Sequence, residues 1–337
     1  VRDVYPIIYP MQVGWKPRGD SGIEMTDWWP QLAGEVDELC FVRNMWTTDN
    51  DHAAENQIHT GRHRLDEQQP SVGAWAHYGL GTLNENLPKF VVLGGPTRSD
   101  TRLSIDSLYL GPQHCGVPLA IDPTNPLPFG QRQASQSLEQ QRREYELIGR
   151  LNQLSAVEYP SDQKLLARIR AWELAFRMQQ SIPNIVDFSQ ETAQTQALYG
   201  LDQPHCRDFG MQLLAARRLV ERGVRFVQLS LGGWDHHANI SAELKKKCGE
   251  IDRPVAALLR DLRQRGLLDD TLVIWGGEFG RTPVSENGDG RDHNPYGFSM
   301  WLAGGGTRGG ITHGATDELG FQAVENKVHI HDLHATI

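Results

Sequence analysis

Short apolar runs along the chain predict five β-strands. Residues 224–231 alternate hydrophobic and polar side chains with a two-residue period and end at Gly232-Gly233, which is typical of a strand followed by a turn. Four other runs are short, apolar and bounded by glycine, proline or polar residues: 39–45, 90–93, 271–275 and 298–303. Runs of this length favour buried strands over helices.

Four longer segments repeat their apolar residues at helical spacing, as Leu165, Ile169, Trp172 and Phe176 do. The predicted helices cover 136–154, 162–180, 210–222 and a segment that opens at Asp252-Arg253-Pro254 and is stopped by Gly266. Strands that alternate with helices favour a parallel sheet covered on both faces. We therefore expect an α/β fold with a mostly parallel sheet sandwiched between helices, in one domain spanning 1–337 with a helical insertion at about 136–200.

Composition narrows the classes of partner. The 337 residues carry a formal net charge of −9, so the chain offers no general electrostatic attraction to a nucleic-acid backbone or an anionic membrane. No run approaches the roughly 18 apolar residues of a membrane span. We expect neither nucleic acid nor a membrane span among the features of this protein.

The cysteines and the chain ends add little chemistry. The four cysteines lie far apart with no C-x-x-C pair, so they predict neither a zinc ribbon nor a thioredoxin-type site and leave any disulfide pairing open. The chain begins at Val1 and stops at Ile337 inside a predicted helix without a cap, so we expect both ends to be trimmed.

Acidic and imidazole side chains flank the predicted strands. They lie in the segments Thr47-Thr48-Asp49-Asn50-Asp51-His52, Trp234-Asp235-His236-His237, Glu278-Phe279-Gly280-Arg281-Thr282 and Arg291-Asp292-His293-Asn294. Loops at the carboxyl ends of parallel strands collect at one sheet edge, so we expect Asp235, His237, Glu278 and His293 to converge. Mixed oxygen and nitrogen ligands suit zinc or manganese, and a site rich in carboxylates can hold two ions.

Plainer explanations compete with the metal hypothesis. An Asp-His pair in a loop commonly forms a hydrogen-bonded turn. Arg281 suits either a surface salt bridge with Glu278 or the binding of an oxyanion beside a metal. Four further histidines lie at a predicted helix end or along a predicted edge strand, where we expect structural or solvated roles: His59, His63, His329 and His331.

Three segments together resemble the domain-of-unknown-function 1501 family, which comprises secreted, sulfatase-like proteins of the alkaline phosphatase superfamily. They are Gly233-Trp234-Asp235-His236-His237, Gly277-Glu278-Phe279-Gly280-Arg281-Thr282-Pro283 and Gly290-Arg291-Asp292-His293. The strand that ends at Glu278 resembles the superfamily strand with a Thr-Ala-Asp-His type motif, and His293-Asn294-Pro295 resembles its late metal-binding histidine. The resemblance covers nearly the whole chain and implies an alkaline phosphatase-like fold and a metal-binding Asp upstream of Val1.

The resemblance also implies a nucleophile in the segment 39–61, which is similar to the strand, turn and helix that carry it in the superfamily. Thr48 is the candidate by its distance from His52, Thr47 is next, and Asp51 takes the position when it is counted back from Gly61. Cys40 lacks the Pro-Ser-Arg sequence that sulfatases need to form formylglycine. Phe279 occupies the place of a metal-binding histidine, which argues against a conventional second ion.

The resulting hypothesis is a metal-dependent hydrolase of phosphate or sulfate esters, with Thr48, His52 and Arg281 as catalytic residues and His52 as ligand or general base. The predicted metal ligands are Asp235, His237, Glu278, Asp292 and His293. The expected cofactor is a divalent metal, zinc first and manganese or calcium as alternatives. The expected substrate is an anionic ester, with a sulfated or phosphorylated glycan among the candidates, and the family resemblance implies a secreted or periplasmic location.

The competing hypothesis is a non-catalytic secreted protein that keeps the fold and binds a polyanionic glycan or a surface partner, because fold does not imply function. A purely structural domain is disfavoured, since clustered carboxylates without a metal would repel one another.

Overall fold

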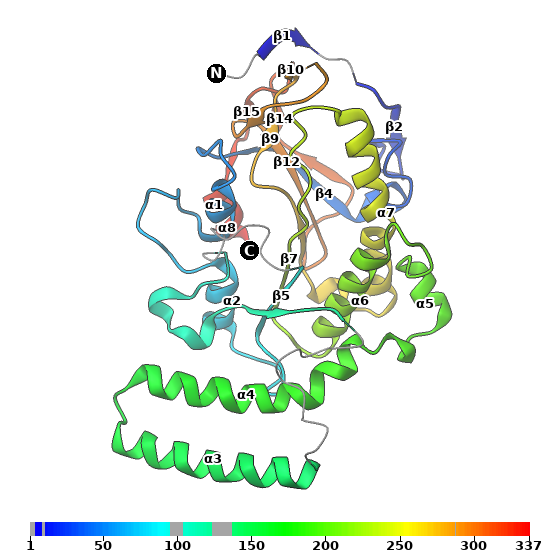
Figure 1. The fold of residues 1–337 in the computed structure, drawn as a ribbon. Helices are drawn as coiled ribbons and strands as arrows, with labels where there is room; N and C mark the ends of the chain where they lie inside the picture. The colour runs from blue at the N-terminus through cyan, green and yellow to red at the C-terminus, as the bar shows by residue number, and fades with distance from the viewer. Residues whose placement is uncertain (1–3, 9–10, 95–103, 123–136, 287) are drawn as a thin grey trace. The chain divides into compact units, whose positions relative to one another are not determined.

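The computed structural model describes residues 4–8, 11–94, 104–122, 137–286 and 288–337, and Figure 1 traces their helices and strands. The chain forms two compact units. The first unit comprises Val1–Gln68, Glu191–Arg217 and Leu231–Ile337, and the second comprises Gln69–Gln190 and Arg218–Ser230. Residue 136, where the predicted helical insertion begins, lies outside the described residues.

A mixed five-stranded sheet forms the centre of the first unit. Its strand order is β13-β4-β12-β8, and β16 also pairs with β4. Strand β12 runs antiparallel to both of its neighbours, whereas β13 and β16 run parallel to β4. The strands are β4 (Leu39–Trp46), β8 (Val273–Trp275), β12 (Phe298–Ala303), β13 (Ile311–His313) and β16 (Val328–His329).

The expected alkaline phosphatase-like fold, with a mostly parallel sheet sandwiched between helices, is therefore wrong. Within the described residues the strands form several small sheets, and the central one is antiparallel at β12. The reason lies in the connection between β8 and β12, which has no helix to carry the chain back to the starting edge. Without a crossover, two successive strands of one sheet pair antiparallel.

The described part of the first unit also contains four two-stranded ribbons. They pair β1 (Val4–Ile8) with β10 (Val284–Glu286), β2 (Trp15–Arg18) with β3 (Ile23–Thr26), β9 (Gly280–Arg281) with β11 (His293–Asn294), and β14 (Ala315–Thr316) with β15 (Ala323–Glu325). All four ribbons are antiparallel. The ribbon of β9 and β11 matters most for function, because it places the segments after Trp275 and after Gly290 side by side.

Seven helices begin in the described part of the first unit. They are η1 (Leu32–Glu38), α1 (Ala54–Thr60), α5 (Ala193–Leu198), α6 (Arg207–Glu221), α7 (Ile240–Gln264), η6 (Leu268–Asp270) and α8 (Ile330–Thr336). Helix α7 starts twelve residues before the predicted opening at Asp252, and Pro254 lies inside it. Helix α1 ends at Gly61, whose φ of 73° is left-handed and favours glycine.

The core of the first unit lies between the central sheet and helix α8. Val42 and Met45 of β4 pack with the alternate residues Phe298, Met300 and Leu302 of β12. Ile330 and Leu333 of α8, which follow much later in the sequence, complete this cluster. Burial of these apolar side chains fixes the end of β4, from which the polar segment 47–52 extends.

The second unit contains a three-stranded parallel sheet with the order β6-β5-β7. Its strands are β5 (Phe90–Leu93), β6 (Val117–Leu119) and β7 (Phe226–Leu229), and its helices are α2 (Val72–Leu80), η3 (Leu108–Leu110), η4 (Pro112–His114), α3 (Leu138–Glu158), α4 (Gln163–Val186) and η5 (Phe188–Gln190). The long helices α3 and α4 lie side by side (Figure 1). Among the described residues, parallel pairing is thus confined to this smaller sheet and to the pairs that β4 forms with β13 and β16.

The described residues contain neither a membrane-spanning helix nor a disulfide. Within the described residues, each helix is too short or too polar to traverse a lipid bilayer. Cys40, Cys115, Cys206 and Cys248 are all free thiols, so none of the pairings that the sequence left open is formed.

Candidate metal centre

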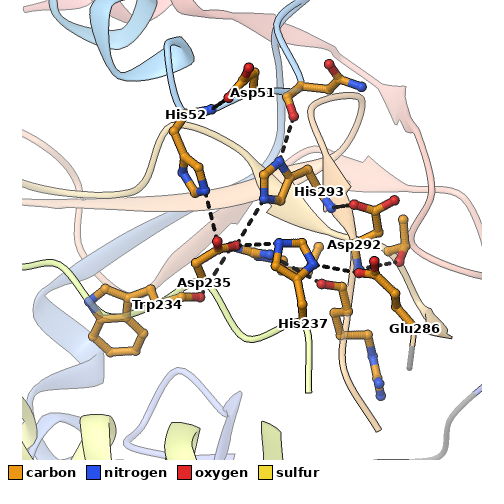
Figure 2. A network of polar contacts seen from close by, with 12 residues as sticks. Asp51, His52, Trp234, Asp235, His237, Glu286, Asp292 and His293 are labelled. Atoms are coloured by element: carbon orange, nitrogen blue, oxygen red, sulfur yellow. Dashed lines mark hydrogen bonds and ion pairs between the residues drawn. The ribbon is translucent and has the colours of Figure 1, made fainter. Parts of the chain in front are cut away.

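Three histidines surround the carboxylate of Asp235 in the first unit (Figure 2). The Nε2 atoms of His237 and His293 lie 2.8 and 3.0 Å from Asp235 Oδ1, and the Nε2 atom of His52 lies 3.0 Å from Asp235 Oδ2. The residues are up to 241 positions apart (293 − 52). Three imidazole nitrogens therefore contact the one carboxylate of Asp235.

Each of these histidines is anchored through its other ring nitrogen. His52 Nδ1 lies 3.0 Å from Glu278 Oε1, and His237 Nδ1 lies 2.6 Å from Glu286 Oε2. His293 Nδ1 lies 2.6 Å from the carbonyl oxygen of Asn50. A carboxylate or a carbonyl only accepts, so each Nδ1 donates and each Nε2 is left to face the Asp235 carboxylate.

The residues of the cluster come from segments that lie far apart in the sequence of the first unit. His52 follows β4 in the polar turn before α1, His293 lies in β11, and Asp235 and His237 follow β7 in a loop. The loop is fastened to the β11 segment, because the Arg291 N–H donates to the His236 carbonyl at 3.0 Å. Gly290 permits this approach, since a Cβ atom there would lie 1.9 Å from the His237 carbonyl oxygen.

The structure brings Asp235, His237 and His293 together and places Glu278 on the far side of His52, but not for the expected reason. These residues do not share the edge of one parallel sheet. Strand β7 belongs to the three-stranded sheet, while β8 lies antiparallel to β12 in the mixed sheet. The β9–β11 ribbon and the clasp at Gly290 bring the residues together instead.

Positive charge concentrates around Asp235. Arg281 donates from its Nη2 atom to Asp235 Oδ1 at 2.8 Å, so its carboxylate partner is Asp235 rather than the predicted Glu278. Burial by itself would raise the pKa of Asp235, but the hydrogen bonds from Arg281, His293 and His52 outweigh it and hold the pKa far below its ordinary range. Asp235 is therefore an anion at any physiological pH.

The arrangement fits a divalent ion. Ligand atoms of His52, Asp235 and His293 all lie within 4.8 Å of one another. A tetrahedral zinc shell of radius ~2.1 Å separates its ligands by roughly 3.4 Å, so small side-chain shifts suffice to place an ion among them. Three imidazolium rings beside Arg281 would repel one another, whereas neutral imidazoles turned toward a cation do not.

The two remaining predicted ligands, Glu278 and Asp292, do not belong to the group formed by His52, Asp235 and His293. Glu278 contacts Nδ1 of His52 rather than the Nε2 side. Asp292 lies with His237 and Glu286 in a second group whose ligand atoms are within 4.8 Å of one another. One Asp292 oxygen accepts the backbone N–H of His293 at 2.8 Å, which helps to fix the ligand strand. These positions suit residues that orient ligands.

The predicted nucleophile lies apart from this network. Thr48 is exposed, and its Oγ1 atom accepts a hydrogen bond of 3.2 Å from Gln57 on α1. Thr47 is buried, and within the described residues its hydroxyl has no hydrogen-bond partner. Asp51 pairs with Arg64 at 3.1 Å, and although burial opposes it, this pairing lowers the pKa of Asp51. None of these side chains is joined to a ring of the cluster by a contact found in the described residues.

Phe279 forms an apolar wall of the centre. Its ring stacks on His293 at a centroid distance of 4.2 Å and lies 5.6 Å from the ring of His52. The Arg281 guanidinium carbon lies 5.6 Å from the Phe279 centroid. Phe279 thus packs against the rings of His293 and His52, which restricts their rotation.

Two groups of the centre were not predicted from the sequence. Glu286 is fully buried at the end of β10, and the Asn50 carbonyl is a backbone group. Glu286 stands in no motif, and Asn50, although it belongs to the polar segment 47–52, contributes its backbone carbonyl and not its side chain. Only the hydrogen bonds to His237 and His293 show their part in the site.

The histidines expected to be structural have local partners. His63 Nε2 lies 3.2 Å from Asp49 Oδ2, and His331 Nε2 donates to the Gly61 carbonyl at 2.5 Å. His329 caps the N-terminus of α8 by accepting the His331 N–H. His59 is half-buried, and burial lowers its pKa to about 4. These contacts agree with the expected structural roles.

A family comparison covers nearly the whole chain. The model of the family described as protein of unknown function DUF1501 matches residues 4–337, so the chain belongs to this family, and the predicted family is confirmed. Kinship with the sulfatases and alkaline phosphatases stays a prediction. Searches of the curated proteins and of the solved structures give no match. The geometry of the centre must therefore carry any statement about activity.

Proposed function

We propose that the protein is a metal-dependent hydrolase of an anionic phosphate or sulfate ester, with one divalent ion held by His52, His237, His293 and Asp235. The observation that carries the proposal is that the two nitrogens of each histidine ring have different partners. All three Nε2 atoms approach the Asp235 carboxylate, and all three Nδ1 atoms have an acceptor behind them. Metal-binding histidines are oriented in this way by carboxylates and carbonyls in metalloproteins.

Zinc is the proposed ion. Three imidazole nitrogens and one carboxylate oxygen are ligands that zinc accepts in tetrahedral geometry. Calcium prefers six to eight oxygen ligands, so the structure disfavours this alternative, and manganese ranks between the two. When bound, such an ion acts as a Lewis acid and lowers the pKa of a water molecule.

The protein's own residues supply orientation and charge. Glu278, Glu286 and the Asn50 carbonyl accept from the three Nδ1 atoms and so orient each Nε2 toward the Asp235 carboxylate, where a bound ion would replace the Nε2 protons. Arg281, partly exposed beside Asp235, offers guanidinium N–H groups to an anionic ester oxygen. Phe279 keeps water from the face of His293 on which it stacks.

Kinship with the sulfatase-like enzymes is part of this proposal, and so is the secreted or periplasmic location that it implies. Its support is the order of the motifs around Asp235, Glu278 and His293 along the chain. Thr48 receives no catalytic role here, because its hydroxyl is turned to Gln57. Water is the nucleophile that this geometry favours.

The test combines metal analysis with an assay. We expect the purified full chain to bind one equivalent of zinc by elemental analysis and to hydrolyse aryl phosphates or aryl sulfates when loaded with zinc or manganese. His293→Ala should lose both properties. If the metal-loaded protein hydrolyses no member of the panel, the competing hypothesis of a non-catalytic binding protein takes its place.

A further inference from the structure

A small surface pocket lies near the metal centre in the first unit. It has a volume of about 240 Å³ and is lined by Trp46, Tyr296, Gln322 and Lys327. This volume is below the ~300–1,000 Å³ typical of pockets for drug-sized ligands, so it suits a group of the size of one ring. Two aromatic rings, one amide and one ammonium group are all the chemistry it offers.

The pocket and the metal centre share two segments of chain. Tyr296 is three residues after His293, and Trp46 is four residues before Asn50, whose carbonyl anchors His293. Fully extended chains of three and four residues span at most ~11 and ~14 Å. A ligand of two or three linked rings in the pocket can therefore reach the metal centre.

Buried contacts fix the walls of the pocket. Asn44, which is fully buried in β4, donates from its amide to the carbonyls of Glu325 and Asn326 and so fastens the turn before Lys327. The Tyr296 carbonyl accepts the Ala323 N–H at 2.8 Å. Trp46 packs against the ring of His329 at a centroid distance of 4.6 Å. The four lining residues thus stand on anchored backbone.

The lining groups remain available to a ligand. Tyr296 is 56% exposed, and Lys327 and Gln322 are exposed as well. In the part of the chain that the structure describes, the Lys327 ammonium forms no ion pair and the Gln322 amide forms no hydrogen bond. Beside two aromatic rings, an ammonium without a carboxylate partner offers a local site for an anion.

We propose that this pocket binds a sugar ring that carries an anionic group, so that the ester substrate is a charged glycan. Aromatic rings pack against the C–H face of a pyranose, because the negative face of the ring attracts weakly positive C–H groups. The Gln322 amide both donates to and accepts from sugar hydroxyls. Lys327 supplies a flexible point charge for a sulfate or phosphate substituent. This inference rests on the proposed function for its reaction, but sugar binding itself requires no metal.

Calorimetric titration of the full chain, zinc-loaded and zinc-stripped, tests the proposal with three probes. They are a monosulfated galactose disaccharide, the same disaccharide without sulfate, and inorganic sulfate. We expect the sulfated disaccharide to bind about fivefold tighter than its unsulfated counterpart, as an exposed ion pair of up to ~1 kcal/mol allows. Inorganic sulfate should give no saturable binding at the same concentrations.

Matched variants separate stacking from charge. Tyr296→Ala should weaken both disaccharides about tenfold, whereas Tyr296→Phe keeps the ring and should stay within about twofold. Lys327→Gln should remove only the preference for sulfate. Tyr109→Ala and Lys16→Gln change exposed residues outside the pocket and should change nothing.

Several results would overturn the proposal: no disaccharide binding, equal weakening by Tyr296→Ala and Tyr296→Phe, or equal loss of both disaccharides in Lys327→Gln. Zinc content measured on the same samples keeps the two proposals apart. Sugar binding by a protein that takes up no zinc when zinc is supplied would refute the metal centre alone, and zinc uptake without sugar binding would refute the pocket alone.

Discussion

Two groups of histidines in this protein differ in what meets their Nδ1 atoms. In the first unit, the Nδ1 atoms of His52, His237 and His293 all have an acceptor. In the second unit, the rings of His77 and His114 pack at a centroid distance of 4.3 Å, and within the described residues neither Nδ1 atom has a hydrogen-bond partner. The rings of the first group are oriented through Nδ1, and those of the second are not.

The surroundings of His77 and His114 also lower the pKa values of these two histidines. Burial lowers the pKa of His77 to about 4, and the positive charges of His114 and Lys89 act in the same direction. The pKa of His114 is lowered as well, mainly by burial. No carboxylate is among the causes of either shift. The comparison teaches that the acceptors behind the rings, and not the number of histidines, distinguish a metal centre from a packed pair.

The largest effect should come from removing one ligand of the centre. His293→Ala should lower zinc affinity by more than about 100-fold, because loss of a direct ligand exceeds the ~10–100-fold cost of losing a group behind one. Competition with a chromophoric chelator measures it. His114→Ala is the matched control and should leave zinc binding unchanged. Equal losses in the two variants would erase the distinction between the two groups.

The packed pair should instead appear in the pH dependence of stability. The folded-state pKa of His77 lies below its unfolded value of ~6.5, so the unfolded chain takes up the proton first as the pH falls. This contribution to stability is complete above pH ~6.5 and is lost down to pH ~4, by up to about 3 kcal/mol. Urea unfolding of the wild type and His77→Leu measures it. Parallel pH profiles for the two proteins would contradict the prediction.

Glu278 decides between a direct ligand and an anchoring group. Glu278→Ala should lower zinc affinity about 10–100-fold, since His52 loses its acceptor. Glu278→Gln keeps an oxygen that accepts from Nδ1 and should retain most of the affinity. If both variants lose the metal to the same extent, Glu278 is a ligand, as the sequence analysis first had it.

The smallest effect is expected at Thr48. Thr48→Ala should leave ester hydrolysis within about twofold and cost about 1 kcal/mol of stability, because it removes one partly exposed hydrogen bond with Gln57. Steady-state kinetics and thermal unfolding check the two numbers. A loss of several orders of magnitude in turnover at unchanged zinc content would restore Thr48 as the nucleophile.

Much of the local structure was predictable because it depends on neighbours in sequence. Strands at 90–93 and 298–303 have the expected bounds, and helix α1 stops at Gly61. Pairing was not predictable in the same way. The order of helices and strands suggested parallel neighbours, while the direction of β12 depends on the absence of a crossover helix after β8.

The candidate site divides along the same line. The residue types that the motifs supplied, Asp235, His237 and His293, stand at the centre, and His52 joins them. Glu286 gave no signal, because a buried carboxylate is recognised only by what it contacts. Glu278 was predicted to bind the metal because the sequence gives the residue type but not the atom that its carboxylate contacts. In the structure that atom is Nδ1 of His52.

By itself, the sequence determined the chemical inventory of this protein: a family membership over residues 4–337, an acidic chain without a membrane-spanning helix in its described part, and a set of histidines and carboxylates in short motifs. The tertiary structure decided which Nε2 atoms converge on Asp235 and which groups hold them there. The physical reason is that local backbone preferences act over a few residues, whereas hydrogen bonds between positions 50 and 293, or 237 and 286, exist only after the chain has packed.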